Sequence, residues 1–528
     1  MPAVFDPQSS RMTLFAALLR AMRTHGAKKE ILEDPERQPL TYGRLVLGAM
    51  VLGAELAKGT RRMETVGVLL PNVVGLPVVI FGLNAFGRVP ALLNFSAGVK
   101  NLRSAIHTGV IRRLITSRRF ISLSNLQPII DDLAKIEVAP GKLLEIVYLE
   151  DVRGKIGLKE KISGVVRAKL AGRVHRRYAL GPDQPGVVLF TSGTEGVPKG
   201  VVLTNANLIA NAMQIITHSD PHFTPADIVM DPLPIFHSYG LTAGMLMPVL
   251  NGLKCVLYPS PLHYKEIPKL VAATKSTILF GTDTFLQGWS RAAEPGDLKS
   301  VRFVVAGAEK VKDTTKATWS AFGTTILEGY GATECSPVIT CTLPHMQKPG
   351  SVGTILPGIE VRVEPVQGIN EGGRLMVRGP NVMAGYYLAD KPGVLVPTRD
   401  GWHDTGDIVD IDANGMVSIK GRAKRFAKIG GEMVSLAAVE GCVSMIWPDN
   451  NHVVLSIADA KRGEQLILVT DRSDADRGAV LAAAKAQGLP ELWVPRTVKC
   501  VETIPVLASG KVDFMSAQDL VKDMSVTG

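Results

Sequence analysis

The stretch GVVLFTSGTEGVPKG, residues 186–200, joins an apolar run to a loop of glycines, hydroxyl side chains and one lysine. A short apolar run bounded by turn residues predicts a buried strand. The loop has little side-chain bulk, so its amides and hydroxyl groups can approach phosphate oxygens, and Lys199 adds positive charge. Its spacing does not fit the G-x-x-x-x-G-K-S/T pattern. The stretch predicts a nucleotide site of another kind. A glycine-rich loop considered alone is a surface turn about as often as a phosphate site.

Apolar runs around this stretch alternate with segments of helical character, among them LLEIVYL, KCVLY, STILF, VRFVVAG and TTILEG. That alternation predicts an α/β fold with helix-covered, mostly parallel sheets. After Val352 the runs IEVRVEP, GRLMVRG, DIVDID and MVSIKG follow one another closely, which indicates a β-rich subdomain. We place a large N-terminal domain at residues 1–421, with the β-rich subdomain at about 350–421, and a small α+β C-terminal domain at 422–528.

The composition is that of a globular enzyme, with 46% hydrophobic and 20% charged residues. The five cysteines are scattered along the chain and form no C-x-x-C pair, which argues against a zinc site or a disulfide framework and favours a reducing cytoplasm. The apolar runs at residues 45–54 and 73–86 are shorter than the ~20 residues that span a bilayer, so we predict buried helices there. Arg20 and Arg23 directly follow the apolar run MTLFAALL, and we therefore expect no signal peptide.

Much of the formal net charge of +10 lies in one segment, residues 153–177. Nine lysines and arginines stand there against Glu160 alone, and Leu158, Ile162, Val165, Val166 and Leu170 recur at helical spacing. Three alternatives stay open for this basic helix: packing of the apolar stripe on its own domain, contact with anionic lipids, or docking of an acidic protein. Nucleic acid is disfavoured because no aromatic residues interleave with the charges.

Six motifs occur in a fixed order along the chain and carry a family resemblance. They are the loop TSGTEGVPKG (191–200), PIFHSYG (234–240), GYGATE (329–334), WHDTGDI (402–408), GRAKRFAKIGGE (421–432) and PVLASGKVD (505–513). The chain thereby resembles the acyl-adenylate-forming superfamily of acyl-CoA ligases, luciferases and peptide-synthetase adenylation domains.

A finer resemblance rests on Glu195, where most relatives have threonine, and on the segments 258–264, 304–310 and 421–436. These look most like the acyl-acyl carrier protein synthetase half of the bifunctional 2-acylglycerophosphoethanolamine acyltransferase. That larger protein also has an acyltransferase domain with an H-x4-D motif. His222 and Asp227 share this spacing, but they lie in the segment leading to PIFHSYG, and we interpret the match as accidental.

The resemblance implies that ATP joins a carboxylate to AMP, because the resulting mixed anhydride has a carbonyl that a thiol can attack. Catalysis is then mostly positioning and charge neutralisation around the phosphates. By resemblance, the loop that cradles the β- and γ-phosphates contains Thr191, Ser192, Gly193, Thr194 and Lys199. Glu334, assisted by Thr194, is the candidate Mg²⁺ ligand, as suits a hard cation that needs few protein oxygens.

The nucleoside contacts also follow from the resemblance. Tyr330 would stack on adenine, with Gly331 beside it, and Thr333 would contact the α-phosphate. The base pocket would be lined by Gly307, Ala308 and Glu309, and the ribose hydroxyls held by Asp407 and Arg422. Alone, each of these residues has an ordinary structural interpretation, such as a solvated acid or a core ring.

Lys511 is by resemblance the adenylation lysine, which reaches the α-phosphate from the small domain. The small domain would therefore be mobile, with Lys424 at the hinge and Gly430–Gly431 along the thiol's approach. His237 would border the acyl pocket, where amino-acid-activating relatives carry an aspartate. Small residues at Gly240 and Gly244 fit either a flexible apolar slot or ordinary core packing.

We therefore expect a fatty acid ligase that charges the phosphopantetheine thiol of an acyl carrier protein. A fatty acyl-CoA ligase with CoA as acceptor is the alternative, and a catalytically silent nucleotide- or lipid-binding protein is the third hypothesis. ATP and Mg²⁺ are the expected substrate and metal. We expect a cytoplasmic location, with peripheral contact at the inner face of the membrane through residues 153–177 as the alternative.

Overall fold

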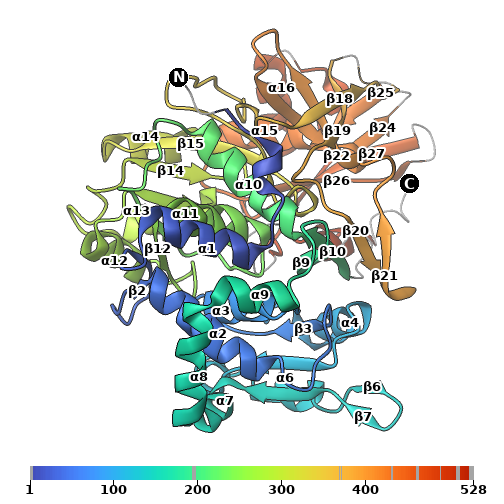
Figure 1. The fold of residues 1–528 in the computed structure, drawn as a ribbon. Coiled ribbons are helices and arrows are strands. Elements are labelled where there is room, and N and C mark those ends of the chain that lie inside the picture. The colour runs from blue at the N-terminus through green and yellow to red at the C-terminus, as the bar shows by residue number, and fades with distance from the viewer. Residues whose placement is uncertain are drawn as a thin grey trace. The chain divides into compact units, whose positions relative to one another are not determined.

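The computed structural model describes residues 4–192, 198–367, 369, 371–429, 432–459, 463–487, 489–506 and 512–522 (Figure 1). The chain forms two compact units. The first contains Met1–Gln347, Gly353–Glu360 and Arg378–His403, and the second contains Lys348–Val352, Val361–Val377 and Asp404–Gly528. Much of the β-rich region thus groups with the C-terminal residues, while the division at residues 421 and 422 stays a prediction.

A nine-stranded sheet forms one layer of the first unit. Its central strands are parallel, as the alternation of apolar runs predicted, and antiparallel strands stand at both ends. The strand order is β17 (Thr354–Ile355), β16 (Val338–Cys341), β15 (Thr325–Gly331), β14 (Phe303–Ala306), β13 (Ile278–Gly281), β11 (Ile228–Asp231), β12 (Lys254–Leu257), β1 (Glu30–Glu33) and β2 (Leu40–Thr41).

An eight-stranded sheet forms the other layer and contains the predicted strand GVVLF. The strand order is β21 (Lys391–Pro397), β20 (Gly385–Leu388), β10 (Pro198–Thr204), β9 (Pro185–Ser192), β4 (Val89–Leu92), β3 (Thr65–Val68), β5 (Arg113–Thr116) and β8 (Glu145–Tyr148). The half from β9 to β8 is parallel, whereas the half from β9 to β21 is antiparallel.

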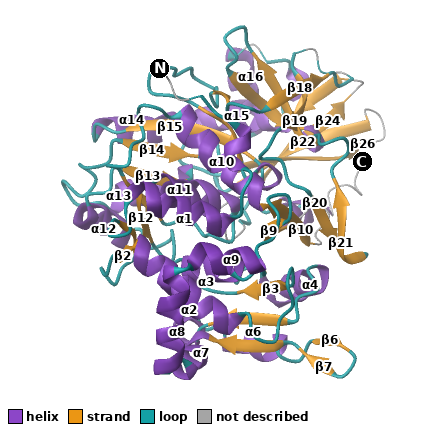
Figure 2. Ribbon diagram, viewed as in Figure 1, coloured by secondary structure: helices purple, strands orange, loops and turns teal. Residues whose placement is uncertain are grey.

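Helices pack on the strands of the first unit (Figure 2). One hydrophobic cluster joins strands of both sheets to α1 (Leu14–His25), α2 (Tyr42–Leu56), α3 (Gly75–Ala85) and α10 (Asn205–His218). The two apolar runs predicted as buried helices lie within or largely within α2 and α3, and both helices bury most of their side chains. No helix in the described part of the chain is long and apolar enough to cross a bilayer.

The remaining helices and the hairpin of the first unit lie between these strands in the chain. They are α4 (Gly98–Thr108), α5 (Arg118–Leu123), α6 (Gln127–Leu133), β6 (Glu137–Ala139), β7 (Lys142–Leu143), α7 (Leu149–Lys155), α8 (Leu158–Lys169), α9 (Ala171–Tyr178), the π-helix η2 (Tyr239–Leu246), α11 (Met247–Asn251), α12 (Glu266–Thr274), α13 (Asp283–Ala292) and α14 (Asp313–Ala321). The fold of this unit is α/β, as the sequence predicted.

The second unit has two sheets. One contains β18 (Glu360–Glu364), β19 (Gly373–Arg378), β22 (His403–Ile411) and β23 (Val417–Arg422). The other contains β25 (Glu432–Ser435), β24 (Phe426–Ile429), β27 (Gly463–Thr470) and β26 (His452–Asp459), with β28 (Thr497–Cys500) pairing with β27. Two apolar clusters fill this α+β region together with α15 (Leu436–Ile446), α16 (Arg477–Ala486) and α17 (Phe514–Asp519).

Candidate active site

The glycine-rich loop connects two antiparallel strands, β9 and β10. The register places Thr191 opposite Lys199, and both side chains are half-buried. The predicted loop residues Gly193 and Thr194 lie outside the described residues, as does the side chain of Ser192. A P-loop runs from a strand into a helix. Here the chain returns as a strand, which explains why the spacing of the P-loop motif is not followed.

Tyr386 on β20 links the lysine of this hairpin to the predicted metal ligand. Its hydroxyl donates a hydrogen bond of 2.8 Å to Oε1 of Glu334, and Nζ of Lys199 lies 5.7 Å from the centre of its ring. The Met383 amide, just before β20, donates to the backbone carbonyl of Glu334 at 2.8 Å. Tyr386 pairs with Val201 across the strands, so Lys199 is its diagonal neighbour on the same face. Tyr386 belongs to none of the six motifs, and sequence reasoning missed it.

A hydrogen bond joins two of the predicted motifs. Thr333 begins the short 3-10 helix η3 (Thr333–Cys335), and Ser238 Oγ donates to Thr333 Oγ1 at 3.3 Å. The neighbouring His237 is half-buried, with its ring centre 4.8 Å from that of Phe236. Phe236 also packs edge-on against Phe95. His237 therefore stands at an aromatic cluster beside the residue that contacts Thr333.

The predicted base-pocket residues gather at the carboxyl ends of two adjacent parallel strands. Gly307, Ala308 and Glu309 follow β14, while Tyr330 stands near the end of the neighbouring β15. This edge is where ligands bind in parallel α/β sheets. Glu309 is held in place because its Oε2 accepts hydrogen bonds from the amide and the hydroxyl of Thr284, at 3.1 and 2.9 Å.

Close backbone packing fixes the turn after Tyr330. A Cβ atom on Gly331 would lie 2.1 Å from the carbonyl oxygen of Pro337, so only glycine fits there. Ala308 holds a φ of +70° and is exposed, a conformation uncommon for a residue with a Cβ. Such outliers often occur at ligand sites, where the surrounding structure maintains the strain.

The segment after PIFHSYG forms the buried π-helix η2, and its glycines are tightly packed. A Cβ on Gly240 would lie 2.6 Å from the carbonyl oxygen of Leu233, and one on Gly244 would lie 2.4 Å from either carboxylate oxygen of Asp231. Gly240 and Gly244 therefore leave room for Leu233 and Asp231, which pack directly against them. At these two positions the structure favours ordinary core packing over an apolar slot.

Asp231, at the end of β11, is a further residue that sequence reasoning missed. Its carboxyl is fully buried, accepts a hydrogen bond of 3.2 Å from the Leu233 amide, and leaves Oδ2 without a partner among the described residues. Burial raises the pKa of Asp231 well above its usual range, opposed in part by that hydrogen bond. Burial likewise raises the pKa of Tyr239, whose hydroxyl donates to the Val305 carbonyl at 2.8 Å. In both groups burial therefore favours the neutral form.

The predicted ribose-binding pair lies in the second unit. Asp407 on β22 pairs with Arg422 on β23, and Nε of Arg422 lies 2.8 Å from Oδ1 of Asp407. The Asp407 side chain is 6% exposed and that of Arg422 is 60% exposed. Lys424 lies in the short helix η4 (Ala423–Arg425). Lys511 and Gly430–Gly431 lie outside the described residues.

The side chains near Glu334 fit a metal ion that binds together with the phosphates of a nucleotide. Within the described ranges no three His, Cys, Asp or Glu side chains are grouped to hold an ion. Glu334 offers one oriented carboxylate, and Mg²⁺ commonly takes one or two carboxylates together with phosphate oxygens and water.

Known proteins resemble this chain over most of its length. The sequence profile of the AMP-binding enzyme family matches residues 18–387. A long-chain-fatty-acid–CoA ligase of Haemophilus influenzae is 24% identical over 518 residues, covering 92% of each chain. A probable 4-coumarate–CoA ligase 3 of Dictyostelium discoideum is 29% identical, covering 72% of this chain and 71% of its own. The structure of ATP-bound MatB from Rhodopseudomonas palustris shares the fold with a TM-score of 0.80 and 24% identity, covering 98% of this chain and all of that one.

Proposed function

This chain belongs to the AMP-binding enzyme family, and we propose that it activates a long-chain fatty acid with ATP and transfers the acyl group to CoA. It is an AMP-forming acid–thiol ligase. The long-chain substrate and the CoA acceptor are those named for the relatives from Haemophilus influenzae and Yersinia pestis. Their matches cover at least 90% of this chain. This acceptor is the alternative of the sequence analysis, and it now has better support than the acyl carrier protein.

One observation carries the proposal. The hydroxyl of Tyr386 donates a hydrogen bond to Glu334, from the motif GYGATE, and the centre of its ring lies 5.7 Å from Nζ of Lys199, at the root of the glycine-rich loop. A cation on β10 and a carboxylate of η3, from distant motifs, thereby lie beside the same tyrosine of β20. That combination suits a polyphosphate whose metal needs one protein carboxylate and whose own charge needs a lysine.

The reaction assigns a task to each group. A carboxylate oxygen of the fatty acid attacks the α-phosphorus of ATP, the bond to the β-phosphate breaks, and pyrophosphate leaves. Thr191 and Lys199 would hold the outer phosphates, and Thr333 would contact the α-phosphate. Glu334 would hold the metal, which would supply positive charge against the negative charge that develops there. Tyr330 and residues 307–309 hold the base, and Lys511 neutralises the α-phosphate and the substrate carboxylate.

The second step transfers the acyl group. A thiolate attacks the carbonyl carbon of the acyl-adenylate, the bond from this carbon to the phosphate oxygen breaks, and AMP leaves. Asp407 and Arg422 would bind the ribose, and rotation of the small domain about Lys424 would withdraw Lys511 and admit the thiol along Gly430–Gly431. His237 would border the acyl and thiol channels.

An acyl carrier protein is the second candidate acceptor, favoured by Glu195 and by the finer resemblance of the segments around it. The experiment is product analysis by mass spectrometry, with ATP, Mg²⁺, palmitate and either CoA or a holo-acyl carrier protein. Palmitoyl-CoA with AMP supports the proposal. If a thioester forms on the carrier protein and none forms on CoA, the acceptor is the carrier protein and the CoA proposal is wrong. AMP formation with neither acceptor consumed would refute both.

A further inference from the structure

Helix α8 presents its apolar stripe to the outside of the first unit. Its inner side packs on α2 at Gly164, which is buried, and a Cβ there would lie 2.2 Å from Cγ2 of Val51. The opposite side carries Leu158, which is 75% exposed, and Ile162, which is 58% exposed. The packing of this stripe on its own domain, one of the three alternatives left open by the sequence, is therefore wrong.

The exposed stripe is continuous. At 100° per residue, Leu158, Ile162 and Val165 lie within one narrow sector of the helix, and Val166 borders it. Val165, Val166 and Leu170 are each at least 43% exposed. Scattered single apolar residues are ordinary on a protein surface, but a contiguous patch of large aliphatic side chains marks an interaction site.

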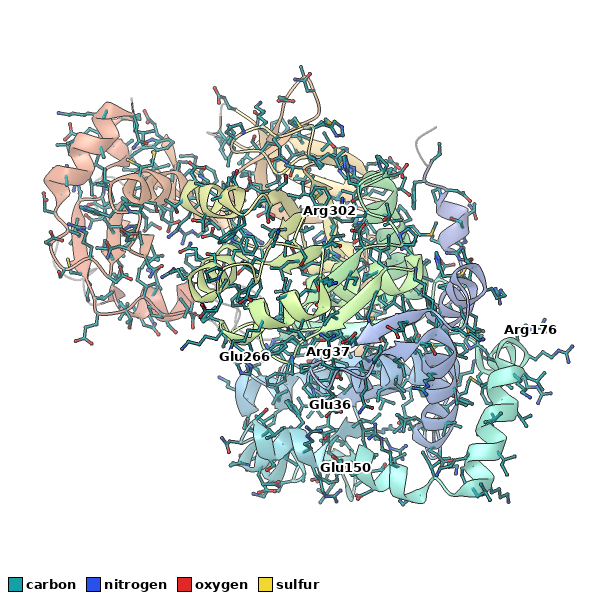
Figure 3. The ribbon with its side chains drawn as sticks, turned by 90° about the vertical axis from the view of Figure 1, so that its left-hand side faces the viewer. Glu36, Arg37, Glu150, Arg176, Glu266 and Arg302 are labelled. Carbon is teal, nitrogen blue, oxygen red and sulfur yellow. The ribbon has the colours of Figure 1, made fainter. Side chains whose placement is uncertain are left out.

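Uncompensated positive charge surrounds this stripe. Lys159 and Lys161 lie on the two sides of the apolar stripe, and Lys169 lies on the face of the stripe at the C-terminal end of α8. None of the nine basic residues of the segment 153–177 forms an ion pair with any residue that the structure describes. Figure 3 shows Arg176 of α9 pointing outward from the ribbon, and the last turn of that helix also contains Arg177.

We propose that the basic helix, α8 with α9, binds the surface of a membrane that contains anionic lipids. The aliphatic side chains of the stripe would enter the boundary between headgroups and acyl chains, while the flanking lysines pair with lipid phosphates. An acidic protein would pair with the charges, but protein interfaces are enriched in aromatic anchors, and the exposed stripe of α8 contains only aliphatic side chains. A lipid surface accounts for both features, and for their occurrence on one helix face.

The test uses the full chain and sedimentation with two kinds of vesicle, phosphatidylcholine alone and an equimolar mixture of phosphatidylcholine and phosphatidylglycerol. The variants are Leu158→Gln with Ile162→Gln, and Lys159→Gln with Lys161→Gln and Lys169→Gln. These side chains are exposed, so the fold should be unchanged, which circular dichroism and activity on a water-soluble short acid would verify. The matched control is Val394→Gln with Lys391→Gln on β21, because Val394 is 56% exposed on the same unit.

The wild type and the control should bind the anionic vesicles and bind the neutral vesicles weakly. Each α8 variant should lower the affinity for anionic vesicles by about tenfold or more. High salt should weaken wild-type binding. Three results would overturn the proposal: no wild-type binding to anionic vesicles, equal binding by the apolar variant and the wild type, or vesicle binding that is intact in the lysine variant while its KM for an acyl carrier protein rises.

Discussion

Replacing Tyr386 by phenylalanine removes a single hydroxyl from the candidate active site. That hydroxyl donates to Oε1 of Glu334 at 2.8 Å, whereas the ring that Nζ of Lys199 approaches would stay in place. Glu334 would then lose the group that fixes the direction of its carboxylate. We expect weaker binding of Mg²⁺ with ATP, and an unchanged kcat when the metal is saturating, because Tyr386 orients the ligand and does not contact the reacting atoms.

The magnitude follows from the type of hydrogen bond. A hydrogen bond to a charged group contributes about 1.5–3 kcal/mol, and both partners here are half-buried, which favours the lower end of that range. Since about 1.4 kcal/mol corresponds to a factor of ten, the Mg²⁺ concentration for half-maximal activity should rise about tenfold.

The assay is pyrophosphate release at increasing Mg²⁺ and saturating ATP and fatty acid. The matched control is Tyr387→Phe, since Tyr387 is the next residue on β20 and its side chain points to the opposite face, into the apolar cluster under β9 and β10. Tyr387→Phe should keep the wild-type dependence on Mg²⁺. The reasoning is refuted if Tyr386→Phe shows the wild-type Mg²⁺ dependence, or if its kcat falls and excess metal does not restore it.

Three further predictions concern other parts of the chain. Lys511→Ala should abolish acyl-AMP formation but leave thioester formation from supplied acyl-AMP largely intact, and equal loss of both half-reactions would contradict the rotating-domain mechanism. Asp407→Ala should raise the Kd for AMP in calorimetry by about tenfold or more, and Arg422→Met by less, because Arg422 is largely exposed; the reverse order would argue against ribose binding by Asp407. Burial favours the neutral acid of Asp227, but hydrogen bonds from a threonine and Arg302 lower its pKa. The ionised carboxylate therefore stabilises the fold above the unfolded pKa of about 4, and this stabilisation is lost as the pH falls through the folded pKa. Arg302→Met should therefore lower the free energy of unfolding at neutral pH by about 2 kcal/mol in urea titrations, with a smaller difference in acid, and a constant difference at all pH values would count against this linkage.

Asp227 also illustrates how the structure resolves a short motif. Its carboxylate accepts hydrogen bonds from the amide of Thr224, the hydroxyl of Thr277 and the guanidinium of Arg302. The carbonyl of His222 accepts a hydrogen bond from the same arginine. These bonds tie neighbouring segments together, in agreement with the interpretation of the H-x4-D spacing as accidental.

Local patterns in the sequence predicted the strand GVVLF and the two buried helices, because a continuous apolar run needs burial wherever it folds. The orientation of α8 could not be predicted in the same way. Helical periodicity separates an apolar face from a polar one, but it does not say which face meets the core. Here Gly164 decides the outcome, because its missing side chain lets α8 approach Val51 closely and turns the aliphatic side outward.

The candidate site shows the same limit for distant contacts. The motifs indicated Lys199 and Glu334 separately, whereas Tyr386 joins them only because β20 pairs with β10 across a long stretch of chain. The buried carboxyl of Asp231 was missed because an aspartate at the end of an apolar strand predicts an exposed turn. Only the packing against Gly244 shows that its carboxyl is enclosed.

The central claim is that this chain makes a fatty acyl-adenylate. The most direct measurement is incorporation of labelled pyrophosphate into ATP without any thiol, over fatty acids of increasing chain length. We predict exchange that requires both Mg²⁺ and a fatty acid and is strongest for long chains. Absence of exchange with every fatty acid tested, or ATP cleavage that yields ADP and phosphate, would contradict the account.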